Sequence, residues 1–428
     1  MKPRALVRSR PCFEQVHKEY MMKEISGGVC APKGFKAGGV ACGIKASSKK
    51  RDLALIYSEK PCAAAAMFTT NKVKAASVLV SQEHIKGGAL QAVIANSGNA
   101  NACTGEAGLE AARKMAGLAA GLLGIDPKKI AVASTGVIGV PLPVGVIEKG
   151  IDALGKSLRS DGEGHAAALE AIMTTDVRKK DGALEIEIEG KTVRIGGMTK
   201  GSGMIHPNMA TMLCFITTDA AISAKALEAS LRGAVKRSFN RCTVDGDTST
   251  NDSIIVMANG EAGNMPISEG TPAFETFSKA LESLCVKLPR AMARDGEGAT
   301  KLVTVTVSGA INEDAAETLG KSIASSSLVK AACFGADANW GRILCAMGYS
   351  GADFEPGDVD VSFAGGGEEI SVCRGGASQV FPEADAKRIL SREEIEIRIK
   401  AGNGPGSAAV WGCDLTYDYV KINGDYRS

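Results

Sequence analysis

The stretch that decides the fold runs from Lys200 to Asp219, "KGSGMIHPNMATMLCFITTD". Its second half, from Met212 to Thr217, is a short run rich in apolar and β-branched residues, which predicts a strand. The first half combines glycines, a His-Pro-Asn step and a threonine, Thr211, directly before that strand. Either the pattern is only a turn that enters a strand, or Thr211 is a nucleophile at its start. The rest of the chain has to decide between these two explanations.

The composition is typical of a soluble globular protein without a strong charge bias. The chain has 428 residues, of which 45% are hydrophobic and 23% charged, and its formal net charge is +2. This length favours two or three domains. The near-neutral charge and an aromatic content of 4% do not indicate the basic, aromatic-rich surface that binds nucleic acid. No apolar run reaches the roughly 18 to 20 residues that cross a bilayer, so we expect neither nucleic acid nor a membrane as a partner.

Twelve cysteines and four histidines are scattered along the chain, and no two cysteines have C-x-x-C spacing. A structural metal site needs closely spaced thiolate or imidazole ligands. The sequence therefore predicts no metal site. The thiols are typical of small core residues in a reducing compartment.

Residues 1–26 differ from the rest and are expected to form a disordered basic extension. Four Lys and Arg residues precede the first acid, Glu14. This bias is found in organelle transit peptides, but residues 1–20 contain only one serine and show no strong amphipathic period. A disordered tail, or a start codon upstream of the true Met21 or Met22, is favoured. We therefore expect a cytoplasmic location, with an organelle as the alternative.

Hydrophobic periodicity alternates between strand-like and helix-like segments. Strands are predicted at residues 53–58, 64–69, 91–96, 130–134, 184–189, 192–196, 212–217, 253–258, 302–308, 359–363 and 394–400. Helices are predicted at residues 105–123, 143–158, 165–173, 223–239, 272–294 and 315–324. The alternation predicts an α/β fold. Within it, "ALEIEIEGKTVRIGG" at 183–197 predicts an antiparallel hairpin.

Two segments match the spacing of binding loops but fail on physical grounds. "GIDALGKS" at 150–157 has Walker A spacing, yet apolar residues at helical spacing run through it, whereas a phosphate loop must leave a strand and open a helix. "DGDTSTND" at 245–252 begins like a calcium loop but has Thr250 where glycine is needed and Val256 where glutamate is needed. This second segment is either a hydrogen-bonded turn or one wall of a polar site.

Two glycine-containing turns join a predicted strand to a predicted helix. They are "ANSGNANACTGEAG" at 95–108 and "AVASTGVIGVPLP" at 131–143. The backbone N–H groups of such turns can point at an anion or at an oxyanion that develops during a reaction. Most turns of this kind are structural, so the two turns are candidates only.

Thr211 has no histidine and acid at the spacing of a catalytic triad, and His206 is interpreted as structural. A base can be supplied in another way. If the Ala210–Thr211 bond is cut, Thr211 gains a free α-amino group with a reference pKa of roughly 7.7 to 8.0. One residue then holds both nucleophile and base. The Thr211 hydroxyl can itself make the cut by attacking the Ala210 carbonyl.

Several longer segments resemble one family, the ornithine acetyltransferases of arginine biosynthesis. The segments are "GGVCAPKGFKAGGVACGIK", "FTTNKVKAA", "ANSGNANACTG", "ASTGVIG", "IMTTD", "KGSGMIHPNMATML", "DGEGATK", "ADANWGRILCAMGYSG" and "WGCDLTYDYVKINGDY". The resemblance covers the chain from about Gly27 to the C-terminus. The central and C-terminal segments match the family more specifically than two proteins that share only a fold would.

The resemblance implies two chains made from one precursor. Cleavage between Ala210 and Thr211 would give an α chain, 27–210 with its extension, and a β chain, 211–428. The implied fold has two mixed α/β domains built from both chains, with the active site at their interface. The β chain would begin with the nucleophile and contribute the second domain.

The resemblance also assigns roles to single residues. Thr211 is the nucleophile, and its amine is the base. The oxyanion donors are Thr135 and Gly136. The implied substrate contacts are Thr174 (with Thr175 as the alternative), Lys200, Thr211, Glu297, Asn423 and Ser428. Family members often end in threonine, so Ser428 departs from the pattern but keeps the hydroxyl.

The implied reaction is a ping-pong transfer of acetyl from N-acetylornithine to glutamate through an acetyl-Thr211 ester. No cofactor is expected, acetyl-CoA stays open as a second donor, and the expected assembly is α2β2 or larger. Two alternatives compete with this prediction. One is a self-processing amidohydrolase or aminopeptidase of the same broad fold, and the other is a non-catalytic binding protein that stays uncut.

Overall fold

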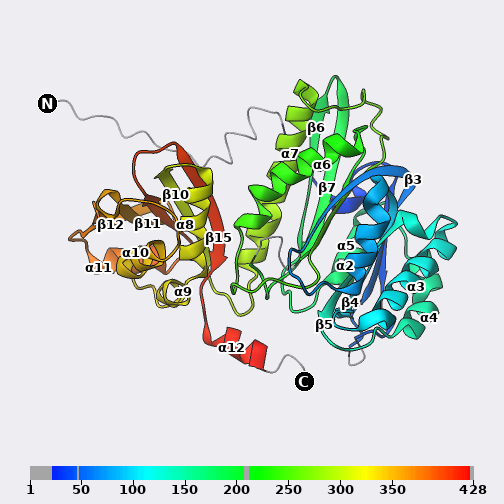
Figure 1. Cartoon of the computed structure of the whole chain (residues 1–428), viewed down its shortest axis with the longest axis horizontal. Coiled ribbons are helices and arrows are strands. Elements are labelled where there is room, and N and C mark those ends of the chain that lie inside the picture. The colour runs from blue at the N-terminus through cyan, green and yellow to red at the C-terminus, as the bar shows by residue number, and fades with distance from the viewer. Residues whose placement is uncertain (1–21, 46–47, 207–211, 425–428) are drawn as a thin grey trace.

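The computed structural model describes residues 22–45, 48–206 and 212–424 of the chain. Figure 1 shows two α/β domains next to each other, with the blue-to-green first part of the chain in one and the yellow-to-red last part in the other. Each domain is built around its own sheet. This confirms the predicted α/β class with two domains.

Within the described residues, the first domain has a nine-stranded sheet. Its strand order is β1 (Lys23–Ile25), β6 (Lys180–Ile188), β7 (Lys191–Lys200), β8 (Leu213–Thr218), β9 (Ser253–Ala258), β3 (Leu53–Phe68), β4 (Ala89–Asn99) and β5 (Ile130–Val137), and β2 (Phe35–Val40) pairs with β3. The pairs β8–β9 and β4–β5 are parallel. The sheet is therefore mixed.

The two halves of this sheet pack face to face around a common core. Residues from both halves, such as Ile56 of β3 and Phe215 of β8, belong to one buried cluster. Helices α2 (Ala76–His84), α3 (Gly105–Leu123) and α4 (Val144–Lys156) cover the outside of the β2–β5 half. Helices α6 (Ala224–Lys236) and α7 (Pro272–Arg294) cover the other half, and α5 (Gly162–Ile172) packs into the common core. The layers thus run helix, sheet, sheet, helix.

Strand β8 is buried on both faces, which explains its unbroken apolar sequence. Cys214 and Ile216 pack toward α6 and α7, whereas Leu213 and Phe215 face the common core. Side chains alternate between the two faces of a strand, so a strand between two layers needs apolar residues at every position. The strand predicted at 212–217 is therefore confirmed, and the structure places it in the middle of the sheet, between β7 and β9.

The hairpin predicted at 183–197 is confirmed as β6 and β7. The two strands pair antiparallel from Lys180 opposite Thr199 to Ile188 opposite Lys191. Glu189 and Gly190 form the turn, with φ values of 51° and 74°. Two consecutive positive φ angles are the geometry of the tight turns that join twisted strands.

The prediction of separate strands at 53–58 and 64–69 is wrong, because β3 is one strand of sixteen residues. Its register shifts between Tyr57 and Cys62, near Pro61, which allows a single strand to pair with β2 and β4 at one end and with β9 at the other. Strands β2, β12 (Glu368–Arg374) and β15 (Gly406–Cys413) were not predicted. Helices α2, α9 (Ser327–Phe334), α10 (Trp340–Gly348), α11 (Glu383–Leu390) and α12 (Tyr417–Gly424) were not predicted either.

The second domain has six strands within the described part of the chain. The order is β13 (Ala377–Ser378), β12, β11 (Asp360–Gly365), β14 (Glu394–Lys400), β10 (Leu302–Ala310) and β15. Helices α8 (Glu313–Ser325), α10 and α11 contribute to its core. All of its strands follow residue 211, whereas the first sheet takes β8 and β9 from after that residue and its other strands from before it.

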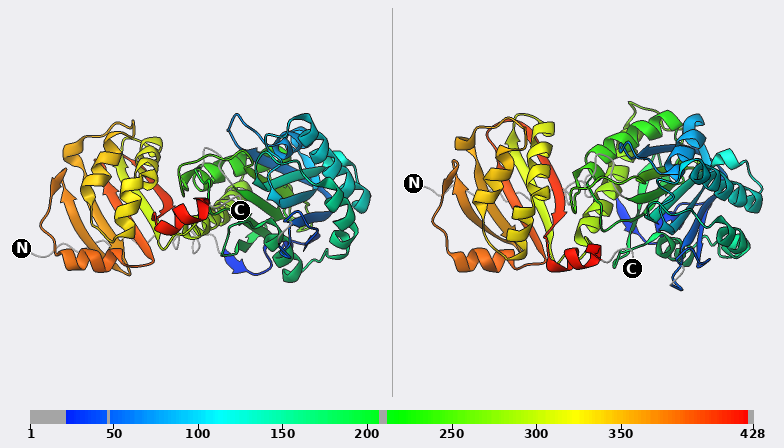
Figure 2. Two further views of the ribbon diagram at one scale, coloured as in Figure 1. Left: turned by 90° about the horizontal axis from the view of Figure 1, so that it is seen from below. Right: turned by 60° about the horizontal axis from the view of Figure 1, so that its bottom comes forward.

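Three features connect the domains. Helix α7 ends just before β10 and contacts β15. Lys330 of α9 is buried and donates to the carbonyls of Val244 (2.6 Å) and Cys413 (2.7 Å). Figure 2 shows α12 next to the junction of the two domains in both views. The chain therefore returns to the junction at its C-terminal end.

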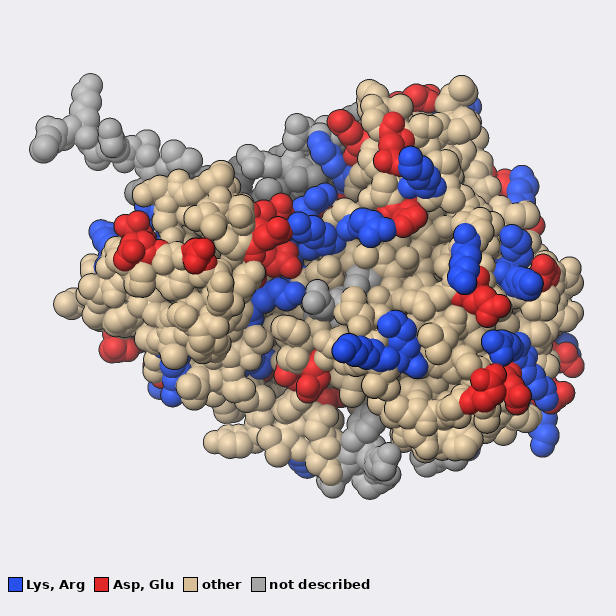
Figure 3. Space-filling model, in the orientation of Figure 1, with Lys and Arg blue, Asp and Glu red and all other residues tan. Residues whose placement is uncertain are grey.

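The distribution of charged side chains on the surface agrees with the near-neutral net charge of the chain. On the face drawn in Figure 3, acidic and basic side chains are interspersed. None of the described helices is long and apolar enough to cross a membrane. The described cysteines are free thiols, and most of them are buried, as predicted. The cytoplasmic location stays a prediction.

We predict that Gly39→Ala destabilises the first domain by about 1–3 kcal/mol. Helix α5 lies so close to β2 that a Cβ at Gly39 would be 2.2 Å from the Ala167 carbonyl oxygen. Gly117→Ala in α3 is the control, because a Cβ there meets nothing within 4 Å and alanine is favoured in a helix. Thermal unfolding followed by circular dichroism measures both, and equal unfolding temperatures for the two variants would contradict the packing argument.

Candidate active site

The site forms where β7 ends and β8 and β9 begin. Lys200, the last residue of β7, pairs with Leu213, and Leu213 pairs in turn with Ser253 at the start of β9. Met212 is the first described residue after the gap at 207–211, and its N–H donates to the carboxyl of Asp252 at 2.8 Å. The sheet register thus places Lys200 and Asp252 on either side of the entry to β8.

Lys200 is buried, with 4% of its surface exposed, and its ammonium contacts two threonines. Its Nζ donates to Thr174 Oγ1 at 2.7 Å and to Thr135 Oγ1 at 3.3 Å. Burial lowers the pKa of Lys200, and the nearby Asp176 opposes that shift. A buried cation held mainly by neutral hydroxyls is suited to an anionic group of a ligand.

Thr135 and Gly136 lie at the end of β5, next to β4. Gly136 has a φ of 134°, and a Cβ there would be 2.4 Å from the Gly98 carbonyl carbon, so only glycine fits. The side chain of Asn251 donates to the carbonyls of Ala100 and Ser134, both at 2.7 Å. These contacts fix the backbone on either side of the predicted oxyanion donors.

Asp176 is the centre of an array of four buried charges, Lys200–Asp176–Lys180–Asp295. The carboxylate of Asp176 is 2.5 Å from Lys180 Nζ and 3.9 Å from Lys200 Nζ, and Lys180 Nζ is 2.6 Å from Asp295. Burial alone would raise the pKa of Asp176, but the two lysines hold it well below its ordinary value. Asp176 also accepts the N–H groups of Thr174 (2.9 Å) and Gly201 (2.7 Å).

Asp176, Lys180 and Asp295 were not predicted as site residues. Two of them lie close to a predicted contact: Asp176 ends "IMTTD" and Asp295 begins "DGEGATK". The sequence signal that could have identified Asp176 and Asp295 was their position within segments that carry predicted substrate contacts. Nothing in the sequence shows that Lys180 joins them, because the turn after α5 and the end of α7 meet only in the folded chain.

Glu297 and Asn423 form a second group of predicted contacts. Asn423 of α12 donates to the carboxylate of Glu297 at 2.8 Å, and Glu297 is 8% exposed. The Glu297 N–H donates to the Ser202 carbonyl at 2.8 Å, two residues beyond Lys200. The Ser202 hydroxyl is 2.7 Å from that of Thr175. Segment 200–203 therefore joins the Lys200 group to the Glu297 group.

The structure thus brings together six of the predicted residues, namely Thr135, Gly136, Thr174, Lys200 and, through the 200–203 segment, Glu297 with its partner Asn423. Of the two alternatives, Thr174 contacts Lys200, whereas Thr175 contacts Ser202. Ala210, Thr211 and Ser428 lie outside the described residues.

The segment 245–252 is both a hydrogen-bonded turn and a wall of this site. Asp245 accepts the N–H groups of Met204 and Ile205, and the Thr248 hydroxyl donates to the His206 carbonyl. His206 contacts the Thr243 hydroxyl at 3.1 Å rather than a carboxylate, in agreement with a structural role. The segment thus holds the chain on both sides of the 207–211 gap.

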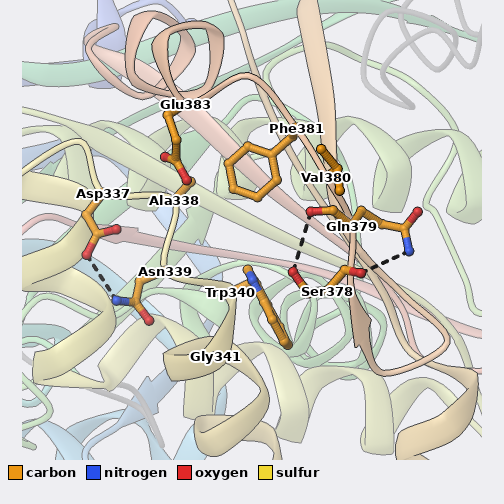
Figure 4. Close-up of a pocket in the computed structure, with 10 residues that line it drawn as sticks. All are labelled: Asp337, Ala338, Asn339, Trp340, Gly341, Ser378, Gln379, Val380, Phe381 and Glu383. Atoms are coloured by element: carbon orange, nitrogen blue, oxygen red, sulfur yellow. Dashed lines mark hydrogen bonds between the residues drawn. The ribbon is translucent and has the colours of Figure 1, made fainter.

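Two other predictions about motifs can be compared with the structure. Residues 150–156 of the Walker-like segment lie inside α4, which confirms that it is no phosphate loop. The start of "ADANWGRILCAMGYSG" lines a separate pocket of about 500 Å³ in the second domain, shown in Figure 4. Trp340, Phe381 and the acids Asp337 and Glu383 line it. This motif therefore does not join the Lys200 group.

The sequence profile of the ArgJ family matches residues 36–428. The chain is 53% identical over 408 residues to "Arginine biosynthesis bifunctional protein ArgJ" of Symbiobacterium thermophilum, covering 95% of this chain and 100% of that protein. It is 48% identical over 415 residues to the protein of the same name from Bacillus subtilis, covering 97% and 100%. The ornithine acetyltransferase of Mycobacterium tuberculosis, solved with ornithine, is 39% identical, with a TM-score of 0.41, over 45% of this chain and 100% of that chain. This chain belongs to the ArgJ family.

We predict that Lys180→Met lowers the free energy of unfolding by about 3–5 kcal/mol at pH 7, because it leaves Asp176 and Asp295 as buried charges without their shared cation. The folded-state pKa of Asp176 lies below its unfolded value. Its contribution to stability is therefore complete above about pH 4 and is lost as the pH falls further. The deficit of the variant should accordingly shrink at acid pH.

Urea unfolding of the variant and of the exposed control Lys179→Met measures this effect. The control should stay within about 0.5 kcal/mol of the original protein. A loss in Lys180→Met no larger than in the control would show that the array does not stabilise the site.

Proposed function

We propose that this chain transfers the acetyl group of N-acetylornithine to glutamate through an ester on Thr211, after cleavage of its own Ala210–Thr211 bond. Membership of the ArgJ family supports acetyl transfer in arginine biosynthesis. The observation that carries the proposal is the buried Lys200, which lies opposite the entry to β8 and contacts Thr135 and Thr174. A buried cation beside candidate oxyanion donors is what an acyl-transfer site for a carboxylate-bearing substrate needs.

Each half-reaction balances with groups from the chain. The Thr211 hydroxyl attacks the acetyl carbonyl while its α-amine accepts the hydroxyl proton. Thr135 and the backbone of Gly136 stabilise the negative oxygen of the tetrahedral intermediate. The C–N bond then breaks, the proton passes to the leaving amine, and ornithine departs. The amine of glutamate attacks the ester, which returns Thr211 and gives N-acetylglutamate.

The charges of the site match the two substrates. N-acetylornithine and glutamate share an α-carboxylate, which Lys200 can pair as a point charge, with Thr174 as a hydrogen-bonding neighbour. Glu297 suits the cationic δ-amine of ornithine, and Asn423 orients its carboxylate. We extend the proposal to Ser428 as a further contact, to an assembly of α2β2 or larger, and to acetyl-CoA as a second donor.

We expect Thr211→Ala to leave the chain uncut and without transfer activity, because it removes the hydroxyl that serves both steps. A denaturing gel with N-terminal sequencing should show two fragments for the original protein, the second beginning with Thr211. Thr318→Ala, which loses an exposed hydroxyl of α8 in the second domain, is the control and should be cut normally. One intact band for the original protein, or normal cleavage of Thr211→Ala, would refute the proposal. Acetate released to water in place of N-acetylglutamate would favour a hydrolase.

A second prediction separates the two donors. Glu297→Gln removes the charge proposed to bind the δ-ammonium of ornithine but keeps an acceptor for Asn423. The KM for N-acetylornithine should rise about 10-fold or more, since a charge-assisted contact contributes roughly 1.5–3 kcal/mol. Transfer from acetyl-CoA to glutamate, which involves no such ammonium, should keep its KM for glutamate. An equal rise for both donors would contradict this assignment.

A further inference from the structure

Lys45 is a half-buried lysine between β2 and β3, and the proposed reaction gives it no role. It is the last residue of the family-like segment 27–45. Its Nζ donates to the carbonyl of Met173 at 2.8 Å and to that of Arg51 at 3.0 Å. Met173 directly precedes Thr174, so Lys45 contacts the segment that carries a proposed substrate contact.

The backbone and the stem of Lys45 are both fixed by their surroundings. The buried carboxylate of Asp52 accepts three N–H groups of segment 42–45, including that of Lys45, at 2.7 to 3.1 Å. The stem passes over Gly98 of β4, where a Cβ would be 2.8 Å from Lys45 Cγ. A lysine with an anchored backbone and a packed stem loses little further side-chain entropy when its ammonium binds a carbonyl.

The contact with Met173 lies at the C-terminal end of α5, where carbonyl groups lack partners within the helix. Helix α5 ends at Ile172, and Met173 is the residue that follows it. The hydroxyl of Ser97 donates to the Ala171 carbonyl at 2.6 Å, as Lys45 does to the Met173 carbonyl. A cation at this end also interacts favourably with the helix dipole. Two side chains from distant parts of the chain therefore hold the end of the helix.

Both polar groups of the peptide unit that joins Met173 to Thr174 are held by buried or half-buried charges. Its carbonyl accepts from Lys45, and its N–H donates to the carboxylate of Asp176 at 2.9 Å. Because a peptide unit is planar, two hydrogen bonds at opposite edges fix its orientation. The hydroxyl of Thr174, which accepts from Lys200 Nζ at 2.7 Å, is attached to this fixed unit.

We propose that Lys45 is a positioning residue that fixes the Met173–Thr174 peptide and so aims the Thr174 hydroxyl at the α-carboxylate that both substrates share. The inference rests on the proposed function, in which Lys200 and Thr174 bind that carboxylate. The carboxylate takes no part in the bonds that form and break. Its contacts therefore contribute equally to binding of the substrate and of the transition state, and Lys45 acts on KM rather than on kcat.

The first test is Lys45→Met, which keeps most of the stem but removes the ammonium. The KM for N-acetylornithine and the KM for glutamate should both rise about 10-fold with kcat nearly unchanged, because a hydrogen bond from a charged group is lost and uniform binding weakens. Lys49→Met is the matched control, since Lys49 is an exposed lysine of the same β2–β3 connection. It should keep both KM values.

A double-mutant cycle with Thr174→Val distinguishes positioning from a purely structural role. Thr174→Val removes the hydroxyl itself and should raise both KM values. Adding Lys45→Met to this variant should then change them by no more than about 2-fold, because nothing remains for Lys45 to position. Thermal unfolding of each variant reports any loss of stability separately, and such a loss alone would leave the KM of the folded protein unchanged.

Four results would overturn the inference: KM values of Lys45→Met equal to those of Lys49→Met, a rise for only one substrate, a fall in kcat without a rise in KM, or fully additive KM increases in the double variant. If Lys45→Met does not fold, Lys45→Gln, which keeps a neutral donor, should raise both KM values, and unchanged values would again overturn it. Failure of the proposed function itself would be visible separately, as an original protein that stays uncut or transfers no acetyl group.

Discussion

The alternating array Lys200–Asp176–Lys180–Asp295 is the interaction on which the arrangement of the site depends. It joins the end of β7, the turn after α5, the start of β6 and the end of α7. Removing Asp176 or Lys180 would leave a buried charge, Lys200 or Asp295, without its nearest charged partner, which costs several kcal/mol. The array therefore holds Lys200 and the Asp295–Glu297 segment in one geometry before a substrate arrives.

A second constraint is the register across β7, β8 and β9. It aligns Lys200, Leu213 and Ser253 at one edge of the first sheet. The segment 245–252 reinforces this edge, because Asp245 anchors Met204 and Ile205, Asn251 anchors Ser134, and Asp252 anchors Met212. One polar segment thus positions the turn that holds Thr135 and Gly136, the approach to residues 207–211 and the strand that follows them.

Much of the fold could be predicted because local patterns agreed with it. Helices α3 and α7 begin and end at the predicted residues, since each has a clear apolar face over many turns. The long strand β3 was divided wrongly because Pro61 and the polar residues before it resemble a turn. Short elements such as α2 and α10 were missed, since two turns of helix carry too little periodicity and depend on tertiary packing.

The sequence by itself determined the α/β class, the strand after Met212 and, through the family segments, the candidate residues Thr135, Thr174, Lys200 and Glu297. Only the tertiary structure decided which of these touch, and that Asp176, Lys180 and Asp252 join them. The physical reason is the distance along the chain over which each kind of interaction acts. Hydrophobic period and turn chemistry act over a few neighbouring residues, whereas buried charges are paired by strand register and helix packing between segments more than a hundred residues apart.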